Sequence, residues 1–257
     1  MAELHLVDLG RSAAALLELE SLHPRLSAED VARISATTDP HARRERQLSS
    51  IALRLVLARL AGDTRYDGKP VQRSTNGKPS IAAAPLSFSV SHSSGWALVA
   101  AVPHGDVLLG VDIQSVAPLA MPAERRLRVL AAGDHLAAGA TRRSSTTDET
   151  ASAIQAWVRI EAVAKASGLG LAHVLARLGV IAATASGPEA KAAAARFAEL
   201  LSRLRVVDLD VEGATGSTCR AALAIGADLA VPTSSPGLLP TDLAGLYRFV
   251  AGGHAQS

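Results

Sequence analysis

Residues 85–114 read PLSFSVSHSSGWALVAAVPHGDVLLGVDIQ, and this stretch decides the fold. It holds three runs rich in β-forming residues, at about 86–91, 96–102 and 107–113, with Ser-Gly and His-Gly breaks between them. Short apolar runs divided by such turn residues predict consecutive strands. We therefore expect a short antiparallel meander in the middle of the chain.

Helical spacing dominates on both sides of this meander. Before it, residues 39–61 predict a long amphipathic helix, and Ser27-Ala-Glu-Asp30 has the form of a capping box that starts an earlier helix. After it comes a polar loop over 140–150, and Thr147 or Asp148 is expected to cap the helix that contains AIQAWVRIEAVAKA. The other expected strands are 4–8, 205–211 and 217–225, and the other expected helices are 122–132, 171–178 and 188–204.

Each half of the chain thus consists of helices followed by a short meander. This pattern predicts an α+β protein made of a pseudo-twofold pair of similar α/β halves, each with a short antiparallel sheet and packed helices. The expected boundaries are 1–118 for the N-terminal half, 119–230 for the C-terminal half and 231–257 for a partly disordered tail. No exact sequence repeat supports the duplication, which is a structural hypothesis.

The composition excludes several classes of protein. The chain has 257 residues, of which 48% are hydrophobic and 19% charged, so a substantial core is expected and wholesale disorder is excluded. A net charge of +2 argues against a polycationic nucleic-acid binder. The single cysteine, Cys219, excludes an internal disulfide framework and is expected in the core. Apolar stretches fall short of the ~20 residues of a membrane span, and the N-terminus lacks a signal-peptide pattern, so we expect a cytoplasmic protein.

Four stretches hold residues that can carry chemistry, and each also has an ordinary structural interpretation. The first runs from Arg73 to Pro79 (RSTNGKP) and places two cations around small polar residues, which suits a phosphate but is also common in exposed turns. The second is FSVSHSSG (88–95), where His92 follows Ser91 at a strand end among hydroxyls. An isolated histidine is more often structural than catalytic.

The third stretch closes an apolar strand at Gly110-Val-Asp-Ile-Gln114. Asp112 and Gln114 share one face of the strand, and Gly110 permits close backbone approach. A carboxylate at this position needs a partner, because burying it unpaired is costly. The partner is either a salt bridge or strand-end cap, or a hard cation such as Mg²⁺.

The fourth stretch is a helix on which Trp157, Glu161 and Lys165 recur every four residues and so share one face. Glu161 and Lys165 also have the favoured orientation of a simple i,i+4 ion pair. That interpretation leaves the tryptophan and the following Gly168-Leu-Gly170 stop without an explanation.

In this order and with this spacing, the four stretches resemble the 4′-phosphopantetheinyl transferase superfamily, specifically its two-half, monomeric type that serves secondary-metabolite and broad-range carrier proteins. The resemblance spans about residues 40–225. It implies the fold of that family, with coenzyme A and an acyl or peptidyl carrier protein as partners, and no nucleic acid or membrane. The matching segments are NGKPSI (76–81), FSVSHSSGWALVAAV (88–102), GVDIQ (110–114), VLAAGDHL (129–136), WVRIEAVAKASGLGL (157–171) and CRAALAI (219–225).

The resemblance implies a Mg²⁺-dependent transfer of the phosphopantetheine arm of coenzyme A to a serine hydroxyl of the carrier, with release of adenosine 3′,5′-bisphosphate. Negative charge builds on the pyrophosphate during attack, so a metal and cations must face it. Asp112 and Glu161 correspond to the Mg²⁺ ligands, one from each half, with Gln114 as a further ligand. Glu161 or a metal-bound water is the candidate base, and Lys165 would assist the leaving group.

The same resemblance implies the coenzyme A contacts. Ser91 and His92 match the pair that contacts phosphate, and Arg73 and Lys78 match positions that hold the 3′-phosphate side. One arginine of the long helix, Arg43 or Arg44, is expected to contribute. The implied catalytic set is Asp112, Glu161, Lys165 and His92, and the implied coenzyme A-binding set is Arg44, Arg73, Gly77, Lys78, Pro79, Ser91, His92 and Lys165.

Two departures from the family pattern leave other functions open. Gln114 stands where a second acid is frequent, and Ile160 stands where a lysine usually precedes the glutamate; Arg159 cannot replace that lysine because adjacent helical residues point about 100° apart. One alternative is therefore a degenerate member that binds coenzyme A or a carrier protein without efficient transfer. Another is a generic metal-dependent phosphatase or nucleotide hydrolase.

Overall fold

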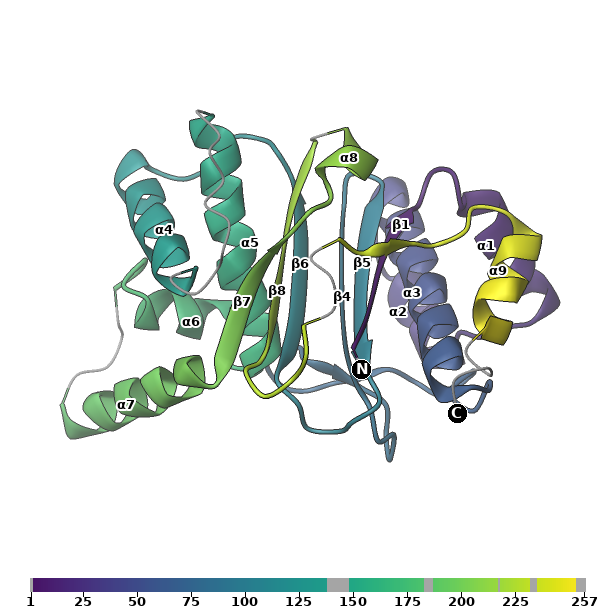
Figure 1. The fold of residues 1–257 in the computed structure, drawn as a ribbon, viewed down its shortest axis with the longest axis horizontal. Helices are drawn as coiled ribbons and strands as arrows, with labels where there is room; N and C mark the ends of the chain where they lie inside the picture. Colours follow the sequence, from purple (N-terminus) through teal and green to yellow (C-terminus); the bar gives the residue numbers. More distant parts are fainter. Residues whose placement is uncertain (1, 138–147, 183–186, 217, 232–234, 253–257) are drawn as a thin grey trace. The chain divides into compact units, whose positions relative to one another are not determined.

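A computed structural model gives the fold of the chain (Figure 1). The chain divides into two compact units, and we call them unit 1 and unit 2. Unit 1 comprises residues 1–106 and 236–257, and unit 2 comprises residues 107–235. None of the helices in the described part of the chain is long and apolar enough to cross a membrane. The structure describes residues 2–137, 148–182, 187–216, 218–231 and 235–252.

Unit 1 is built on a four-stranded sheet in the order β4-β5-β1-β9. β5 (Trp96–Val102) is central and pairs antiparallel with both β4 (Ser87–Ser93) and β1 (Glu3–Asp8). β9 (Gly237–Leu238) adds to the outer side of β1 in the parallel sense. The helices of this unit are α1 (Ala13–Leu22), α2 (Ala28–Ser35), α3 (Pro40–Ala61) and α9 (Leu243–Ala251), and a small hairpin is formed by β2 (Gln72–Arg73) and β3 (Pro79–Ser80).

The long helix α3 organises unit 1, and its ends follow from local sequence. The Asp39 side chain accepts a hydrogen bond from the Ala42 N–H over 2.6 Å, Pro40 occupies the first turn, and Gly62 ends the helix with φ +70°. Leu48 and Leu55 pack with β1, α1 and α9, whereas other apolar residues of the helix pack with β4 and β5. The predicted helix over 39–61 is confirmed almost to the residue.

The C-terminal residues belong to unit 1 rather than forming a separate tail. The Leu239 N–H donates to the Leu6 carbonyl over 2.9 Å, and α9 begins at an Asp242 side chain that accepts from the Gly245 N–H over 2.8 Å. Leu246 of α9 is fully buried in the core with α1 and α3. We expected a tail at 231–257, but over 236–251 the chain forms β9 and the docked amphipathic helix α9. Residues 253–257 lie outside the described residues.

Unit 2 is built on a three-stranded antiparallel sheet in the order β6-β8-β7. α5 (Glu149–Ser167) packs on β6 and β8, and α4 (Ala123–Leu136) packs on α5. The strands are β6 (Leu109–Ser115), β7 (Leu204–Leu209) and β8 (Cys219–Gly226), and the remaining helices are α6 (Leu171–Arg177), α7 (Pro188–Ser202) and α8 (Glu212–Thr215).

Local signals also fix the ends of α5. Asp148 is the N-cap and accepts from the Thr150 and Ala151 N–H groups, so one of the two predicted caps is confirmed. Gly168 ends the helix with φ +66°, at the predicted stop. Thr147 and most of the loop expected at 140–150 lie outside the described residues.

The division between the units falls between residues 106 and 107, earlier than the expected boundary at 118. The reason is β6, which pairs with β8 along seven residue pairs from Leu109 to Ser115 and packs against α5. β6 therefore belongs to unit 2 although it follows β5 directly along the chain. Asp112 and Glu161, which were expected one in each half, consequently lie in the same unit.

The two units share one strand order. In unit 1, β1 comes first along the chain, and the pair β4 and β5 comes after the long helix α3. In the sheet these strands lie in the order β4-β5-β1. In unit 2 the order β7-β8-β6 repeats that pattern, with α5 in the place of α3. All four pairings are antiparallel. The structure is of the α+β class, and each unit has the short antiparallel sheet and packed helices expected from the sequence.

Candidate functional site

Four predicted residues of unit 2 gather where α5 crosses β6. Asp112 and Gln114 lie on β6, and Glu161 and Lys165 lie on α5, one turn apart. We call these four residues the carboxylate–lysine cluster. Trp157, the third residue on the same stripe of α5, is partly buried against the core of unit 2.

A glycine makes this crossing close. A Cβ atom at Gly110 would lie 2.1 Å from the Ala162 carbonyl oxygen and 2.4 Å from the Ala166 nitrogen, both in the backbone of α5. Any other residue at this position would push the helix away from the strand. Because Gly110, Asp112 and Gln114 alternate along β6 onto one face, the glycine brings the helix onto the face that carries the two polar side chains.

The cluster is held by hydrogen bonds between strand and helix. The Lys165 ammonium donates to Asp112 Oδ1 over 2.7 Å, and the Gln114 amide nitrogen donates to Glu161 Oε2 over 3.4 Å. The Asp112 side chain is 1% exposed, whereas that of Lys165 is 33% exposed. A fully buried carboxylate is thus paired with a cation that reaches the surface, which offsets most of the cost of burying the negative charge.

The second carboxylate of the cluster has an unusual proton affinity. Burial, followed by the negative charge of Asp112 and hydrogen bonding with it, raises the pKa of Glu161 to about 7. The Lys165 charge and the Gln114 hydrogen bond oppose the rise without cancelling it. A carboxylate with a pKa near 7 can accept or release a proton at neutral pH, which is the property required of a general base.

The donor set of the cluster fits a hard divalent cation. Mg²⁺ is usually bound by one or two carboxylates together with waters and substrate phosphates, and Asp112 and Glu161 supply two carboxylates in one place. A cation there would relieve the repulsion that raises the pKa of Glu161. Within the described residues no group of three or more His, Cys, Asp or Glu side chains gathers in a way that could hold a metal. The cluster therefore suits a metal that is completed by substrate or water.

The two residues before Glu161 face elsewhere. Ile160 has no exposed surface and belongs to the apolar core of unit 2. The Arg159 guanidinium binds Asp208 of β7, with Nε 2.7 Å from Oδ1 and Nη2 2.6 Å from Oδ2. Neither residue supplies a cation to the cluster, as expected from their different directions on the helix. Asp134 of α4, in contact with Arg159 Nη1 at 3.5 Å, also lies on this other side.

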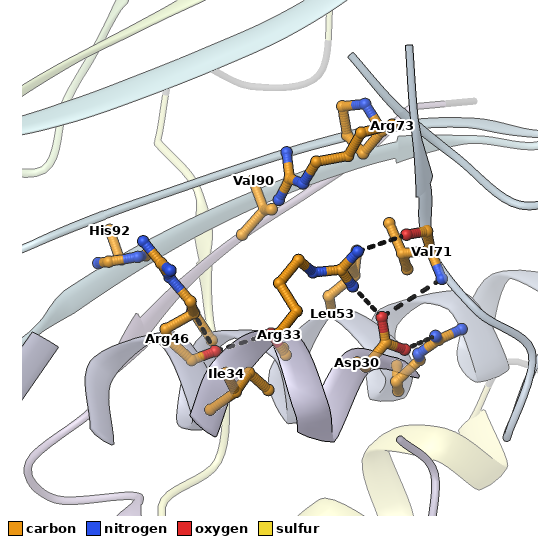
Figure 2. Close-up of a pocket in the computed structure, with 13 residues that line it drawn as sticks. Asp30, Arg33, Ile34, Arg46, Leu53, Val71, Arg73, Val90 and His92 are labelled. Carbon is orange, nitrogen blue, oxygen red and sulfur yellow. Dashed lines mark hydrogen bonds and ion pairs between the residues drawn. The ribbon is translucent and has the colours of Figure 1, made fainter. Parts of the chain in front are cut away.

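In unit 1, several of the other predicted residues line a cavity of about 330 Å³ (Figure 2). Four arginines line it, namely Arg33 of α2, Arg46 and Arg54 of α3 and Arg73 of β2, and His92 of β4 lines it as well. We call this cavity the arginine pocket. Figure 2 shows Arg46 extending beside His92, with Arg73 on the wall that carries Val90.

A buried aspartate anchors one wall of the arginine pocket. Asp30 accepts hydrogen bonds from Arg33 and from Arg54, whose Nη2 lies 2.6 Å from Oδ2. Arg33 also donates to the Val71 carbonyl over 2.9 Å, as Figure 2 shows. Burial alone would raise the pKa of Asp30, but the Arg54 hydrogen bond and charge, with help from Ser27 and Arg33, hold it below its usual value. The carboxylate is therefore ionised and fixes Arg33 in place.

The charge in the arginine pocket favours an anion. Arg73 remains exposed to solvent, but partial desolvation beside the pocket, followed by the positive charges of Arg33 and Arg46, lowers its pKa. Four guanidinium groups in one small cavity repel one another, and Asp30, which pairs with Arg33 and Arg54, is the acid that lines it among the described residues. A phosphate between them would relieve the repulsion and accept several charge-assisted hydrogen bonds.

His92 is oriented by a residue of α3. Its Nδ1 lies 3.4 Å from Glu45 Oε2, and Glu45 Oε1 in turn accepts the Gly95 N–H of the β4–β5 turn. The Glu45 side chain is largely buried. The contact places the histidine ring at the edge of the arginine pocket and attaches the strand end to the helix.

The remaining predicted residues divide between the pocket and other positions. Pro79 lines the arginine pocket, but Gly77, Lys78, Ser91 and Arg44 do not. Gly77 holds the β2–β3 turn with φ +86° and accepts a 3.0 Å hydrogen bond from Arg73 through its carbonyl. Burial lowers the pKa of Lys78, while Asp106 opposes this shift. Ser91 is buried and points to the opposite face of β4 from His92, and Arg44 is exposed on α3.

Four residues of the arginine pocket and its support were not predicted from the sequence: Asp30, Arg33, Glu45 and Arg46. Asp30 was assigned only to the capping box, which the structure confirms, and the same carboxylate also binds two arginines. Arg46 is two residues beyond the predicted Arg44 and follows the helical spacing of Ser49 and Ser50, which line the same cavity. Helical phase relative to the buried leucines of α3 would have distinguished Arg46 from Arg44.

Comparison of the chain with models of known protein families gave no match, and neither did a search among curated proteins.

Proposed function

We propose that the protein is a 4′-phosphopantetheinyl transferase, which moves the phosphopantetheine arm of coenzyme A to a serine of an acyl or peptidyl carrier protein. The observation that carries this proposal is the carboxylate–lysine cluster, in which Gly110 lets α5 place Glu161 and Lys165 against Asp112. The resemblance of the motif order to that family and the arginine pocket of unit 1 support the same reaction class.

Mg²⁺ would be held by Asp112 and Glu161, and when bound it would draw negative charge from the pyrophosphate oxygens. Gln114 was expected as a third ligand, but in the structure its amide nitrogen donates to Glu161. This contact orients the carboxylate, so Gln114 serves best as a support for a ligand. A water or a phosphate oxygen would then complete the coordination.

In the proposed reaction the serine oxygen of the carrier forms a bond to the β-phosphorus, and the bond from that phosphorus to the leaving phosphate oxygen breaks. Among the cluster residues, Glu161 is the candidate base that accepts the serine proton. Lys165 stabilises the charge on the leaving adenosine 3′,5′-bisphosphate. The arginine pocket of unit 1 suits a phosphate group, to which His92, held by Glu45, can donate a hydrogen bond.

The direct test is the intact mass of an apo carrier protein after incubation with coenzyme A, Mg²⁺ and this protein. The expected result is a gain equal to one phosphopantetheine arm, lost on addition of EDTA and in Asp112→Ala. Asp208→Asn is a matched control, because Asp208 is a partly buried acid of the same unit that binds Arg159 away from the cluster. Absence of any mass gain across acyl and peptidyl carriers, with each protein folded, would contradict the proposal.

A second function has one observation in its favour. Ile160 stands where the family that the sequence resembles usually has a cation, and Arg159 is bound to Asp208, so neither residue before the glutamate supplies a positive charge to a substrate phosphate. A protein that binds coenzyme A or a carrier without efficient transfer would have this property. Coenzyme A binding by calorimetry, together with no modification of any carrier at saturating Mg²⁺, would favour this second function.

A further inference from the structure

A second cavity, of about 480 Å³, lies in unit 2 among α4, α6 and α7, away from the carboxylate–lysine cluster. Its volume falls within the range of about 300–1,000 Å³ that is usual for small-molecule sites. None of the four cluster residues lines it. We call it the helical cavity. Nothing in the proposed transfer reaction uses it.

Small side chains on two helices create this hollow. α4 and α7 each contribute four lining residues with the spacing i, i+3, i+4 and i+7, which places the four on one helical face. Alanines occupy two of the four positions on each helix, so the facing side chains do not fill the space between the helices. The residues are Arg128, Ala131, Ala132 and His135 on α4, and Ala194, Phe197, Ala198 and Leu201 on α7.

The floor of the helical cavity is apolar. Phe197 is only 6% exposed and Ala132 only 5%, so both belong to the core of unit 2. Leu178 and Leu201 pack against the same core and also line the cavity. An alkyl chain laid against these four residues would be removed from water, which is the main source of affinity for an apolar ligand.

The charged side chains of the helical cavity are two arginines. Arg128, His135 and Arg177 line it, and among the described residues no acid does. Arg177 is held in place, because its Nη1 donates to the Ala190 carbonyl over 3.1 Å and its Nε lies 3.5 Å from His173 Nε2. Arg128 forms an ion pair with Glu124 one turn earlier on the exposed side of α4. An anionic group would therefore find two guanidinium groups beside the apolar floor.

We propose that the helical cavity is a binding site for a medium-chain fatty carboxylate, with the alkyl chain on Phe197 and the leucines and the carboxylate between Arg128 and Arg177. Charge complementarity selects an acid over an alcohol or an amine, and the apolar floor selects an alkyl chain over a polar metabolite. The site depends on unit 2 alone and stands independently of the proposed transferase activity.

Isothermal titration calorimetry of the full chain with decanoate below its micellar concentration tests the site. Affinity is expected to rise about three- to fourfold for each methylene from hexanoate to decanoate, as burial of each group predicts. Decanol, which has the same chain without the charge, is expected to bind at least tenfold more weakly. Equal affinity of decanoate and decanol would show that the arginines take no part and would overturn the proposal.

Two pairs of variants locate the binding. Ala198→Trp fills the cavity and is expected to weaken decanoate binding at least tenfold, whereas Ala195→Trp, on an exposed position of the same helix, leaves it unchanged. Arg128→Gln is expected to weaken it about three- to tenfold, with Arg125→Gln as the control on the exposed surface of α4. Circular dichroism checks that all four variants fold. No binding by the natural sequence, or the same affinity in Ala198→Trp and Ala195→Trp, would overturn the assignment.

Discussion

Lys165 and Asp112 form a 2.7 Å hydrogen bond that joins the last turn of α5 to the middle of β6. The cation lies at a helix C-terminus, where the helix dipole favours positive charge, and the carboxylate is buried beneath it. The pair therefore holds the site together before any ligand is bound. Because the lysine is one-third exposed, it can also meet an anion from solvent.

Glu161→Gln is expected to reduce transfer about 10²- to 10⁴-fold while leaving the fold intact, because the change removes the proposed base and one carboxylate ligand. Initial rates of carrier modification at saturating coenzyme A give the measurement. Glu149→Gln, at the first turn of the same helix, is the matched control. Full activity in Glu161→Gln would contradict the assigned role.

The same variant is expected to change stability in a pH-dependent way. Since the pKa of Glu161 rises from 4.5 to about 7 on folding, the folded protein binds this proton more tightly than the unfolded chain does. That contribution is complete below about pH 4.5 and is lost as pH rises through 7. Without divalent cations, Glu161→Gln should therefore raise Tm by about 2–6 °C at pH 8 and by little at pH 4.5. A lower Tm for the variant at pH 8 would argue against the raised pKa.

Gly110→Ala is expected to destabilise the protein by about 2–4 kcal/mol, because the added methyl group would overlap the backbone of α5 at Ala162 and Ala166. Urea denaturation monitored by circular dichroism measures the loss. Gly213→Ala, in α8 of the same unit, has no atom within 4 Å of the added group and should change stability little. Similar stability of the two variants would show that the close crossing is not required.

Asp30→Asn is expected to cost about 3–5 kcal/mol at pH 7, because it leaves the buried Arg54 guanidinium without its counter-charge. The pKa of Asp30 is lowered in the fold, so its contribution is present above the usual value of 3.8 and is lost as pH falls below it. The difference between the natural sequence and the variant should thus shrink in acid. Denaturation curves at pH 7 and pH 3 test this; an equal gap at both would contradict it.

Arg73→Gln should raise the KM for coenzyme A about tenfold and leave the KM for 3′-dephospho-coenzyme A unchanged, if the arginine pocket holds the 3′-phosphate. Arg44→Gln, exposed on α3 outside the pocket, is the control. If Arg73→Gln raised both KM values equally, Arg73 would contact a part of coenzyme A other than the 3′-phosphate.

A lysine at residue 160, where the family that the sequence resembles usually has one, is not expected to increase the rate of transfer. Ile160 is fully buried in the core of unit 2, so Ile160→Lys would bury a charge and lower stability by several kcal/mol without bringing an amine to the cluster. Ile160→Leu is the volume-matched control. If the folded Ile160→Lys variant transferred faster than the natural sequence, this prediction would be wrong. Ile160 would then be a cause of slow transfer in the natural sequence.

Sequence patterns predicted best what depends on neighbours along the chain. The capping box at Ser27, the helix that begins after Asp39 and the stop at Gly168 all rest on contacts within a few residues, and the structure confirms each. The strand alternation that brings Asp112 and Gln114 together is equally local. The residues of the carboxylate–lysine cluster could be selected from the sequence because their spacing on β6 and on α5 is also a local pattern.

Features that depend on residues far away along the chain were not predicted. β6 was assigned to the first half because its partner β8 lies about a hundred residues later, and pairing over that distance leaves no local signal. Arg33 was not selected because on α2 it resembles an ordinary exposed cation, and only its contacts with Val71 and Asp30 bring it to the arginine pocket. The helix after Asp242 was missed because the Pro- and Ser-rich stretch PTSSPGLLPTD before it is typical of a disordered tail.

The return of residues 236–251 to unit 1 determines the order in which the protein can be completed during synthesis. Unit 1 contains β1 near one end of the chain and α9 near the other, while every residue of unit 2 lies between them. Unit 2 can thus fold as soon as it leaves the ribosome, whereas in unit 1 β9 joins β1, and Leu246 joins the core beside α3, only at the end of synthesis. In nascent chains stalled before residue 236, unit 2 should accordingly be complete and protected from proteolysis, whereas unit 1 should be less protected because it lacks β9 and α9.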